Sequence, residues 1–199
     1  MIKKLINISI FLFIFSLYFV SFLMIYDNFR ERKLKNLESN ALDYFDNIVK
    51  VEEVKAEELE PEEHFENISY DNYTILGKIE IPRIGFSSVV LKEYTYSAMS
   101  IGVIKTYGSE LNEPGGFILS GHNFRGSNIF MYNISILREG DRISITDAEG
   151  RKLDYTVYEV LRYVNPDDTS YYNTYDGYNV TLITCESGGQ TRIVVKARA

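Results

Sequence analysis

The residues best suited to covalent chemistry stand near the end of the sequence, where the chain's one cysteine, Cys185, precedes Arg192. Two short apolar runs flank Gly188 and Gly189, and a glycine pair between two strands favours a two-residue hairpin turn. That turn places Cys185 directly opposite Arg192, and opposed side chains share one face of a sheet with Cβ atoms about 4.5–5.5 Å apart. The spacing therefore predicts a thiol beside a guanidinium at a strand end.

The same pairing assigns a face to the other residues of the hairpin. Ile183 falls opposite Val194 on the face of the cysteine, which gives that face an apolar floor. Side chains alternate between the two faces of a strand, so the remaining apolar residues, Leu182, Ile193 and Val195, are expected to point into a core.

A nucleophilic cysteine needs a proton partner, and residues 73–199 contain one histidine, His122. It ends the apolar run 116–122 and is followed by turn-forming residues, so its ring can reach a groove. An ordinary thiol is only a few per cent thiolate at neutral pH, and a neighbouring imidazole activates it and carries protons. Each residue alone has a plainer explanation, an inert buried cysteine or a rim histidine. Together with Arg192 they favour nucleophilic catalysis.

The composition of the chain is that of a globular protein of ordinary polarity. It has 199 residues, 45% of them hydrophobic, and a formal net charge of -7. This balance excludes a collagen-like or wholly disordered chain, and a single cysteine excludes an internal disulfide framework. An acidic chain is poorly suited to nucleic acid, because binding phosphates requires a basic surface. We therefore expect no nucleic-acid partner.

The positions that must hold this site lie in a segment of short strands, residues 73–199. Alternating and apolar runs separated by glycine and proline turns indicate seven or eight strands, which predicts an all-β fold closed into a barrel with short helices. A short helical turn is expected within residues 128–137. The strands are expected at residues 75–81, 87–91, 105–107, 116–122, 141–146, 152–160, 179–185 and 191–197.

Two further segments precede the barrel, residues 1–26 and 27–72. Residues 5–26 carry no charge, and 22 residues of helix span roughly 33 Å, enough to cross a bilayer. Bulky residues run into charges without a small-residue cleavage site, which favours an uncleaved transmembrane signal-anchor. Residues 27–72 hold helical spacing and then an acidic run, which we interpret as a helical stalk or linker. It is either a solvated spacer or a helix that packs on the catalytic body.

Four groups of residues resemble sortases, the cysteine transpeptidases of the Gram-positive envelope. Thr181-Leu182-Ile183-Thr184-Cys185 followed by Arg192 resembles the TLxTC…R motif, and Ser120-Gly121-His122-Asn123 resembles the catalytic-histidine strand. Ile79-Glu80-Ile81-Pro82 resembles the opening strand. Ile129-Phe130 with Leu137-Arg138-Glu139-Gly140-Asp141 resembles the segment after the histidine. The likeness covers about residues 75–199.

The resemblance implies a membrane-anchored enzyme that cuts an LPxTG-like sorting signal through a thioacyl-enzyme and transfers the protein to an amine. Cys185 would be the nucleophile, His122 the proton carrier and Arg192 a donor to substrate carbonyls or the oxyanion. The expected partners are surface proteins with sorting signals and a peptidoglycan precursor or other amine acceptor. The remaining candidates for substrate binding are Ser120, Ile183, Thr184, Val194 and Glu186, the last through its backbone N–H.

The resemblance also implies a location and a subclass. Sortases cross the membrane once with the catalytic domain outside the cell, whereas Arg30, Arg32, Lys33 and Lys35 after the span would favour a C-terminus inside by the positive-inside rule. We adopt the family's orientation. The short connection before the cysteine strand favours a class D-like over a class B-like enzyme, and the stalk lacks the Asp-Pro-aromatic lid of pilin-polymerising sortases.

The sequence also bears on cofactors and on functions other than transpeptidation. No cofactor is expected to be required, although some sortases bind calcium and a set of loop acids could do so here. The alternatives to transpeptidation are a non-catalytic membrane-anchored domain that binds envelope components and a thiol peptidase that transfers the acyl group to water. The loop acids are Glu110, Glu113, Asp167, Asp168 and Asp176.

Overall fold

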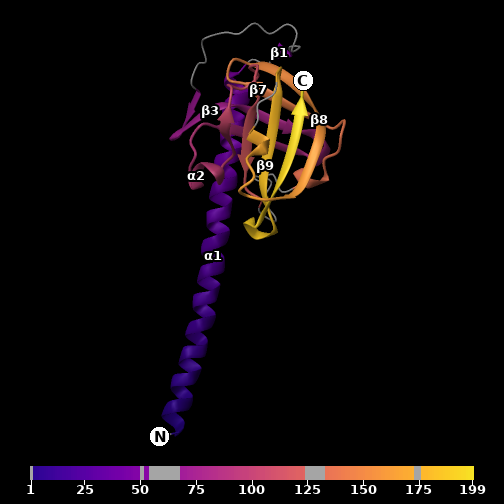
Figure 1. Cartoon of the computed structure of the whole chain (residues 1–199). Helices are drawn as coiled ribbons and strands as arrows, with labels where there is room; N and C mark the ends of the chain where they lie inside the picture. Colours follow the sequence, from indigo (N-terminus) through magenta and orange to yellow (C-terminus); the bar gives the residue numbers. More distant parts are fainter. Residues whose placement is uncertain (1, 50–51, 54–67, 124–132, 173–175) are drawn as a thin grey trace. The chain divides into compact units, whose positions relative to one another are not determined.

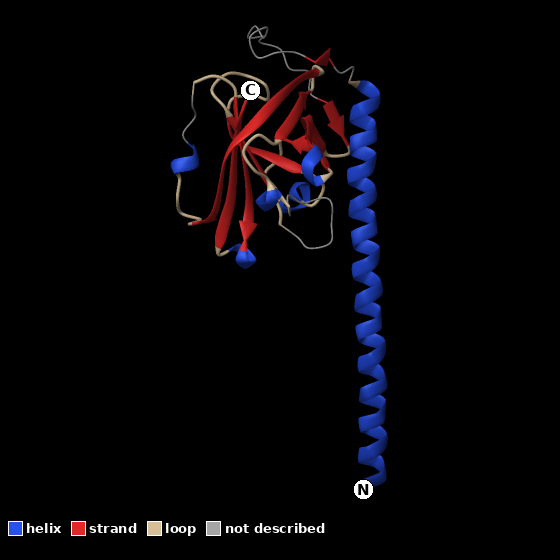
Figure 2. Cartoon of the chain, turned by 90° about the vertical axis from the view of Figure 1, so that its right-hand side faces the viewer, coloured by secondary structure: helices blue, strands red, loops and turns tan. Residues whose placement is uncertain are grey.

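A computed structural model describes residues 2–49, 52–53, 68–123, 133–172 and 176–199. One long helix is followed by strands joined by short helical turns (Figures 1 and 2). The elements are α1 Ile2–Ile48, β1 Glu52–Glu53, β2 Ile68–Tyr70, β3 Tyr73–Ile81, η2 Pro82–Ile84, β4 Phe86–Leu91, α2 Tyr96–Met99, β5 Val103–Gly108, β6 Phe117–Gly121, η3 Ile134–Ile136, β7 Arg142–Asp147, β8 Arg151–Val164, η4 Ser170–Tyr172, β9 Asn179–Glu186, η5 Ser187–Gly189 and β10 Thr191–Arg198.

Eight of these strands close into a barrel. The hydrogen-bonded order runs β3-β4-β5-β6-β9-β10-β8, and β7 pairs with both β8 and β3, which returns the sheet to its start. At the β3–β7 seam the backbones approach so closely that Gly77 leaves no room for a Cβ beside the carbonyl of Thr146. The prediction of a closed all-β barrel is confirmed.

The barrel interior is packed with the apolar side chains that alternate along its strands. The main cluster joins residues of all eight barrel strands and includes Leu182, Ile193 and Val195, as the hairpin predicted. Phe117 meets the buried Tyr155 edge to face, with ring centroids 6.0 Å apart. This core fixes the strands whose ends carry the candidate site.

The expected strands correspond to β3 through β10, with bounds shifted by a few residues. Sequence patterns did not indicate β1, β2 or α2, which are two, three and four residues long and so too short for a periodic signal. The expected helical turn within residues 128–137 appears as η3, where Ile134 and Leu137 are buried; residues 128–132 lie outside the described part of the chain.

The first part of α1 is apolar and exposed. The chain divides into two compact units at Leu37 and Glu38, and in the first unit large apolar side chains between Ile6 and Phe29 are exposed. The helix is long and apolar enough to cross a membrane, with a mean hydropathy of 2.5 over its most apolar window. By length and composition it is therefore a candidate membrane span.

The last turns of α1 belong to the second unit together with the barrel. Ala41, Phe45 and Val49, spaced by four residues on one helix face, are buried. Asp46 accepts a hydrogen bond from Lys78 of β3 at 2.9 Å, and Lys78 lies on the barrel. These contacts agree with a helix that packs on the catalytic body rather than with a spacer that is solvated throughout.

Candidate active site

The C-terminal hairpin has the pairing that the glycines predicted. In the β9–β10 ladder, Cys185 is the partner of Arg192, Glu186 of Thr191 and Ile183 of Val194. Gly188 and Gly189 both have positive φ, 68° and 95°, which is the conformation that glycine adopts without strain. The turn chemistry therefore sets the thiol and the guanidinium on one face of the sheet.

The second strand of the site is β6, which pairs in parallel with β9 on the side away from β10. Gly121 is the partner of Thr184, so His122 follows β6 just as Cys185 continues β9. Two hydrogen bonds tie these strand ends together: the Thr184 hydroxyl donates to the Gly121 carbonyl at 2.7 Å, and the Asn123 amide donates to the Cys185 carbonyl at 2.5 Å. The fold thus brings two residues 63 positions apart to adjoining strand ends.

A small apolar cluster forms the floor next to these strand ends. Ile118 of β6, Ile183 of β9 and Val194 of β10 pack together with Tyr171 of η4, and all four are buried. The cluster lies on the outer face of the sheet, because Ile183 and Val194 share the face of Cys185 and Arg192. We name these four residues the floor cluster; an apolar floor on this face is confirmed.

Arg192 holds its guanidinium over the hairpin. Its Nη1 donates to the carbonyls of Gly189 at 2.8 Å and Thr191 at 3.1 Å, and both acceptors are neutral. Among the described residues Arg192 takes part in no ion pair within 4 Å. Within the described ranges no carboxylate therefore pairs with this cation, and a carbonyl or oxyanion at the Cys185 thiol would lie on the same face.

His122 is half-buried against the ring of Tyr96, the first residue of α2. The two ring centroids are 5.3 Å apart and the rings meet at 61°, edge to face. Burial disfavours the charged imidazolium and lowers the pKa of His122 below its ordinary value. Cys185 is likewise half-buried, so the thiol and the imidazole are both partly accessible to solvent.

The other predicted binding residues lie around the same strand ends. The Ser120 hydroxyl is 3.1 Å from that of Thr106, and Thr184 is buried with its hydroxyl on Gly121. The Glu186 carboxylate accepts from the backbone N–H of Tyr163 at 3.0 Å. Ser120, Ile183, Thr184, Glu186 and Val194 are thus near the thiol, and their role in substrate binding stays a prediction.

The acidic residues considered for calcium are distributed differently. Glu110 pairs with Lys105 and Glu113 pairs with Arg151, each at 3.1 Å. Within the described ranges no three His, Cys, Asp or Glu side chains come together in a way that could hold a metal ion. The calcium site stays a sequence-based expectation.

Comparison with known proteins places this architecture. A family model described as a sortase domain matches residues 79–199, more than half of the chain. The chain belongs to the sortase family. That domain contains all three predicted catalytic residues and the strands that carry them.

Individual sortases align over the same domain. Sortase A of Bacillus anthracis is 30% identical over 121 residues, which cover 61% of this chain and 57% of that protein. The solved lid mutant of Corynebacterium diphtheriae sortase A has a TM-score of 0.58 at 26% identity, over 64% of this chain and 70% of that one. A Clostridium perfringens sortase D5 transpeptidase has a TM-score of 0.55 at 26% identity, over 62% and 78%.

The matched relatives share only part of their length with this chain, and sortases of different classes resemble it almost equally. The chain spans 57% of the length of the Bacillus anthracis sortase that it matches, so activity and substrates require an argument from the site. Structures called sortase A and sortase D5 are similar to nearly the same degree. The class D-like assignment therefore stays a prediction.

Sequence reasoning assigned no role to two residues of the site, Tyr96 and Asn123, although Asn123 belongs to the motif that resembles the catalytic-histidine strand. Asn123 follows His122 in a polar turn, and this proximity was the signal that could have found it. Tyr96 comes from the β4–β5 connection, and nothing local links it to the histidine. Only the cap residue Thr95, whose hydroxyl accepts from the N–H of Ala98 at 3.1 Å, marks the start of a helix there.

Proposed function

We propose that this sortase is a membrane-anchored cysteine transpeptidase that cuts an LPxTG-like sorting signal and joins the new acyl end to a cell-wall amine. The observation that carries the proposal is the convergence of three strand ends. β9 brings Cys185, β10 sets Arg192 opposite it, and β6 ends beside β9 immediately before His122. A binding module would need none of these three.

In the first half-reaction, the thiolate of Cys185 attacks the carbonyl carbon of the threonine in the sorting signal. The C–N bond to the following residue breaks, and the imidazolium of His122 gives its proton to the departing amine. A thioester to Cys185 remains. Arg192 stabilises the oxyanion formed during attack, since a preorganised donor lowers the barrier most where charge develops.

In the second half-reaction, an amine attacks the thioester carbon. Neutral His122 takes the proton from the attacking nitrogen, the C–S bond breaks, and the thiolate is restored. The product is an amide between the surface protein and the acceptor. Water in place of the amine would hydrolyse the thioester to a free acid.

The floor cluster supports the position of the thiol. Its four side chains, Ile118, Ile183, Val194 and Tyr171, are buried and pack together on the face that carries Cys185 and Arg192. They hold the ends of β6, β9 and β10 in place, and an LPxTG-like peptide would bind over this face.

The chemistry is tested by mass spectrometry of the full chain in detergent micelles with an LPxTG-containing peptide. We expect a mass increase equal to the acyl fragment on Cys185, and an amide product that forms only when an amine is added. Release of the free acid at the same rate with and without amine would instead identify a peptidase. No adduct and no cleavage would leave a binding domain.

For location, we propose that α1 crosses the cell membrane once and the barrel lies outside the cell. The chain has one cysteine, so a membrane-impermeant thiol reagent applied to intact cells reports the side on which Cys185 lies. We expect labelling of the unaltered chain and none of Cys185→Ala. Labelling only after lysis would support the orientation favoured by the basic residues after the span.

A further inference from the structure

The contact between Tyr96 and His122 joins α2 to the candidate active site. Tyr96 is 61% exposed, yet its ring lies 5.3 Å from the imidazole with the edge-to-face geometry of favourable ring pairs. An exposed tyrosine is expected to be mobile unless its backbone is held. The geometry of α2 supplies that restraint.

α2 is held in place by its cap and its buried face. The Thr95 hydroxyl caps the helix through the N–H of Ala98, and the Ser100 hydroxyl donates to the Tyr96 carbonyl at 2.9 Å. Ala98 is fully buried. Gly102, just after the helix, leaves no room for a Cβ, which would lie 2.7 Å from the Val89 carbonyl oxygen of β4. These contacts fix where the Tyr96 side chain begins.

We propose that Tyr96 is a positioning residue: its ring covers one side of the His122 imidazole, fixes the orientation of that ring and keeps water from it. The proposal rests on the proposed function, because it assigns a helper to the group that carries the proton. Edge-to-face ring pairs contribute about 0.5–1.5 kcal/mol beyond area burial, enough to favour one ring orientation among a few.

Among the described residues, the ionisable side chains on the strand ends beside His122 are Cys185 and Glu186 of β9 and Arg192 of β10. In the connection that leads to α2, the Glu93 carboxylate accepts from the N–H of Thr74 at 3.0 Å, and on β5 Lys105 pairs with Glu110. Glu93 and Lys105 are therefore bound to other partners. Tyr96 contacts the imidazole directly with its ring.

The shielding predicts a direction for titration. Burial disfavours imidazolium, so removing the Tyr96 ring should admit water and raise the pKa of His122 toward its ordinary value. In the active enzyme the imidazole limb of the pH–rate profile should move to higher pH by the same cause. Loss of ring orientation should lower kcat more than it changes KM, because misplacement acts on the reacting geometry.

The test follows His122 directly by NMR of the full chain in detergent micelles with labelled histidine. Cys185→Ala removes coupling to the thiol, and His64→Gln removes the signal of the other histidine. We expect the His122 midpoint to move to higher pH in Tyr96→Ala and to stay in place in Tyr96→Phe. Tyr94→Ala is the matched control, because Tyr94 is also exposed and lies two residues away.

The second measurement is the steady-state rate of peptide cleavage by variants that keep Cys185. Tyr96→Ala should lower kcat about tenfold, within the range that misplaced catalytic groups cost, and Tyr96→Phe should restore most of the rate. Circular dichroism checks the fold, and Tyr96→Gln repeats the test if the alanine variant unfolds. An unchanged midpoint in Tyr96→Ala with normal peptide cleavage would overturn the proposal alone. A shifted midpoint in a chain that cleaves nothing would support the contact and overturn the proposed function.

Discussion

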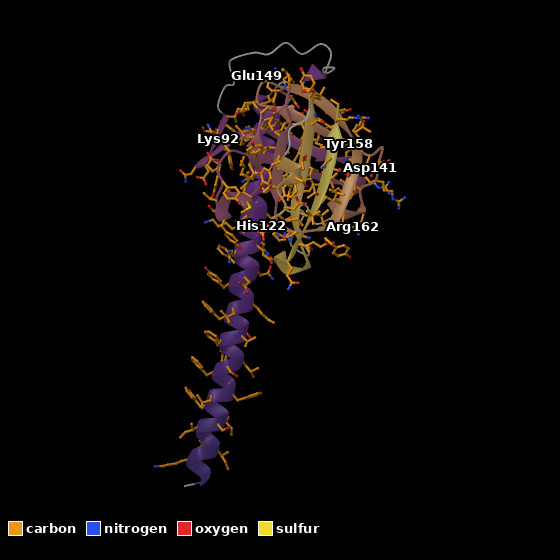
Figure 3. The ribbon with its side chains drawn as sticks, in the orientation of Figure 1. Lys92, His122, Asp141, Glu149, Tyr158 and Arg162 are labelled. Carbon is orange, nitrogen blue, oxygen red and sulfur yellow. The ribbon has the colours of Figure 1, made fainter. Side chains whose placement is uncertain are left out.

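The two ends of strand β8 lie beside arginines in opposite surroundings. Arg151 is the first residue of β8, whereas the last residue, Val164, pairs with Arg192 of β10. Figure 3 shows Glu149 near the first end and His122 and Arg162 near the second. Arg151 is largely buried among carboxylates, with Nε 2.9 Å from Asp147 and Nη1 3.1 Å from Glu113. Arg192 instead donates to two neutral backbone carbonyls.

The cluster at the Arg151 end is held by many mutual hydrogen bonds. The amide of buried Asn112 donates to the Arg151 carbonyl at 2.8 Å, and the Tyr155 hydroxyl donates to Asn112 Oδ1 at 3.0 Å. Burial raises the pKa of Asp147 although Arg151 opposes it, and burial also raises the pKa of Tyr155. Polar groups bonded in this way stabilise the barrel and are not available to a substrate.

The contrast teaches how to distinguish a structural polar cluster from a site. At the Arg151 end, ion pairs and hydrogen bonds hold side chains that are largely buried, so substitutions should change stability. At the Arg192 end, the cation faces neutral acceptors, and the thiol and imidazole are half-buried, so substitutions should change activity with the fold intact.

The largest effect expected at the site end is complete loss of turnover in Cys185→Ala. A small residue replaces a small one at a strand end, so packing changes little. His122→Ala should lose a similar amount, and the double variant should be no worse, because the two residues act as a unit. A peptide-cleavage assay measures the loss of turnover, and thermal unfolding of the same variants checks that the fold is unchanged. Activity that survives in Cys185→Ala would refute the mechanism.

At the other end, Asp147→Asn should lower the free energy of unfolding by about 1.5–3 kcal/mol, because it weakens the charged hydrogen bonds that Asp147 accepts from Arg151. Urea unfolding followed by circular dichroism measures the change. Arg142→Gln is the control: the pair of Arg142 with Asp154 is exposed and should contribute at most about 1 kcal/mol. Equal losses of stability in the two variants would show that the buried Arg151 cluster contributes no more than an exposed ion pair.

Arg192→Lys tests whether geometry or charge matters at the site end. Lysine keeps the charge but lacks the planar fork of donors, so we expect folding and alkylation of Cys185 to be retained. Loss of one preorganised oxyanion donor costs about 2.7–4 kcal/mol, or roughly 100- to 1000-fold in rate. Arg192→Ala should be at least as slow. A lysine variant as fast as the unaltered chain would show that charge alone suffices.

The smallest effect is expected from Tyr155→Phe, which removes one hydroxyl from the Arg151 end. The variant leaves the buried Asn112 carbonyl oxygen without that donor, and such a loss costs about 1–3 kcal/mol. Tyr107→Phe, at an exposed ring, should be neutral in the same unfolding measurement. An unchanged catalytic rate in Tyr155→Phe would support a purely structural role for the Arg151 end. A loss of rate without a loss of stability would contradict that role.

Much of this protein could be predicted because the relevant patterns are local. Period-two alternation marked β3 through β10, and the glycine pair set the Cys185–Arg192 pairing, since a two-residue turn leaves one register for the strands that it joins. The apolar run at the N-terminus indicated a membrane span by length alone. Each conclusion depended on residues within one continuous stretch of the sequence, the longest being the 22-residue run 5–26.

Contacts between distant parts of the chain were decided only by the tertiary structure. Closure of the barrel sets β6 beside β9 and so brings His122 to Cys185; it also gathers Asn112 with Tyr155 and buries Phe45 of α1. α2 is too short for a periodic pattern, so the contact between Tyr96 and His122 could not be predicted from the sequence. The physical reason is that hydrophobic patterning fixes which face of an element is buried, while the choice of neighbour depends on how the whole sheet closes and packs.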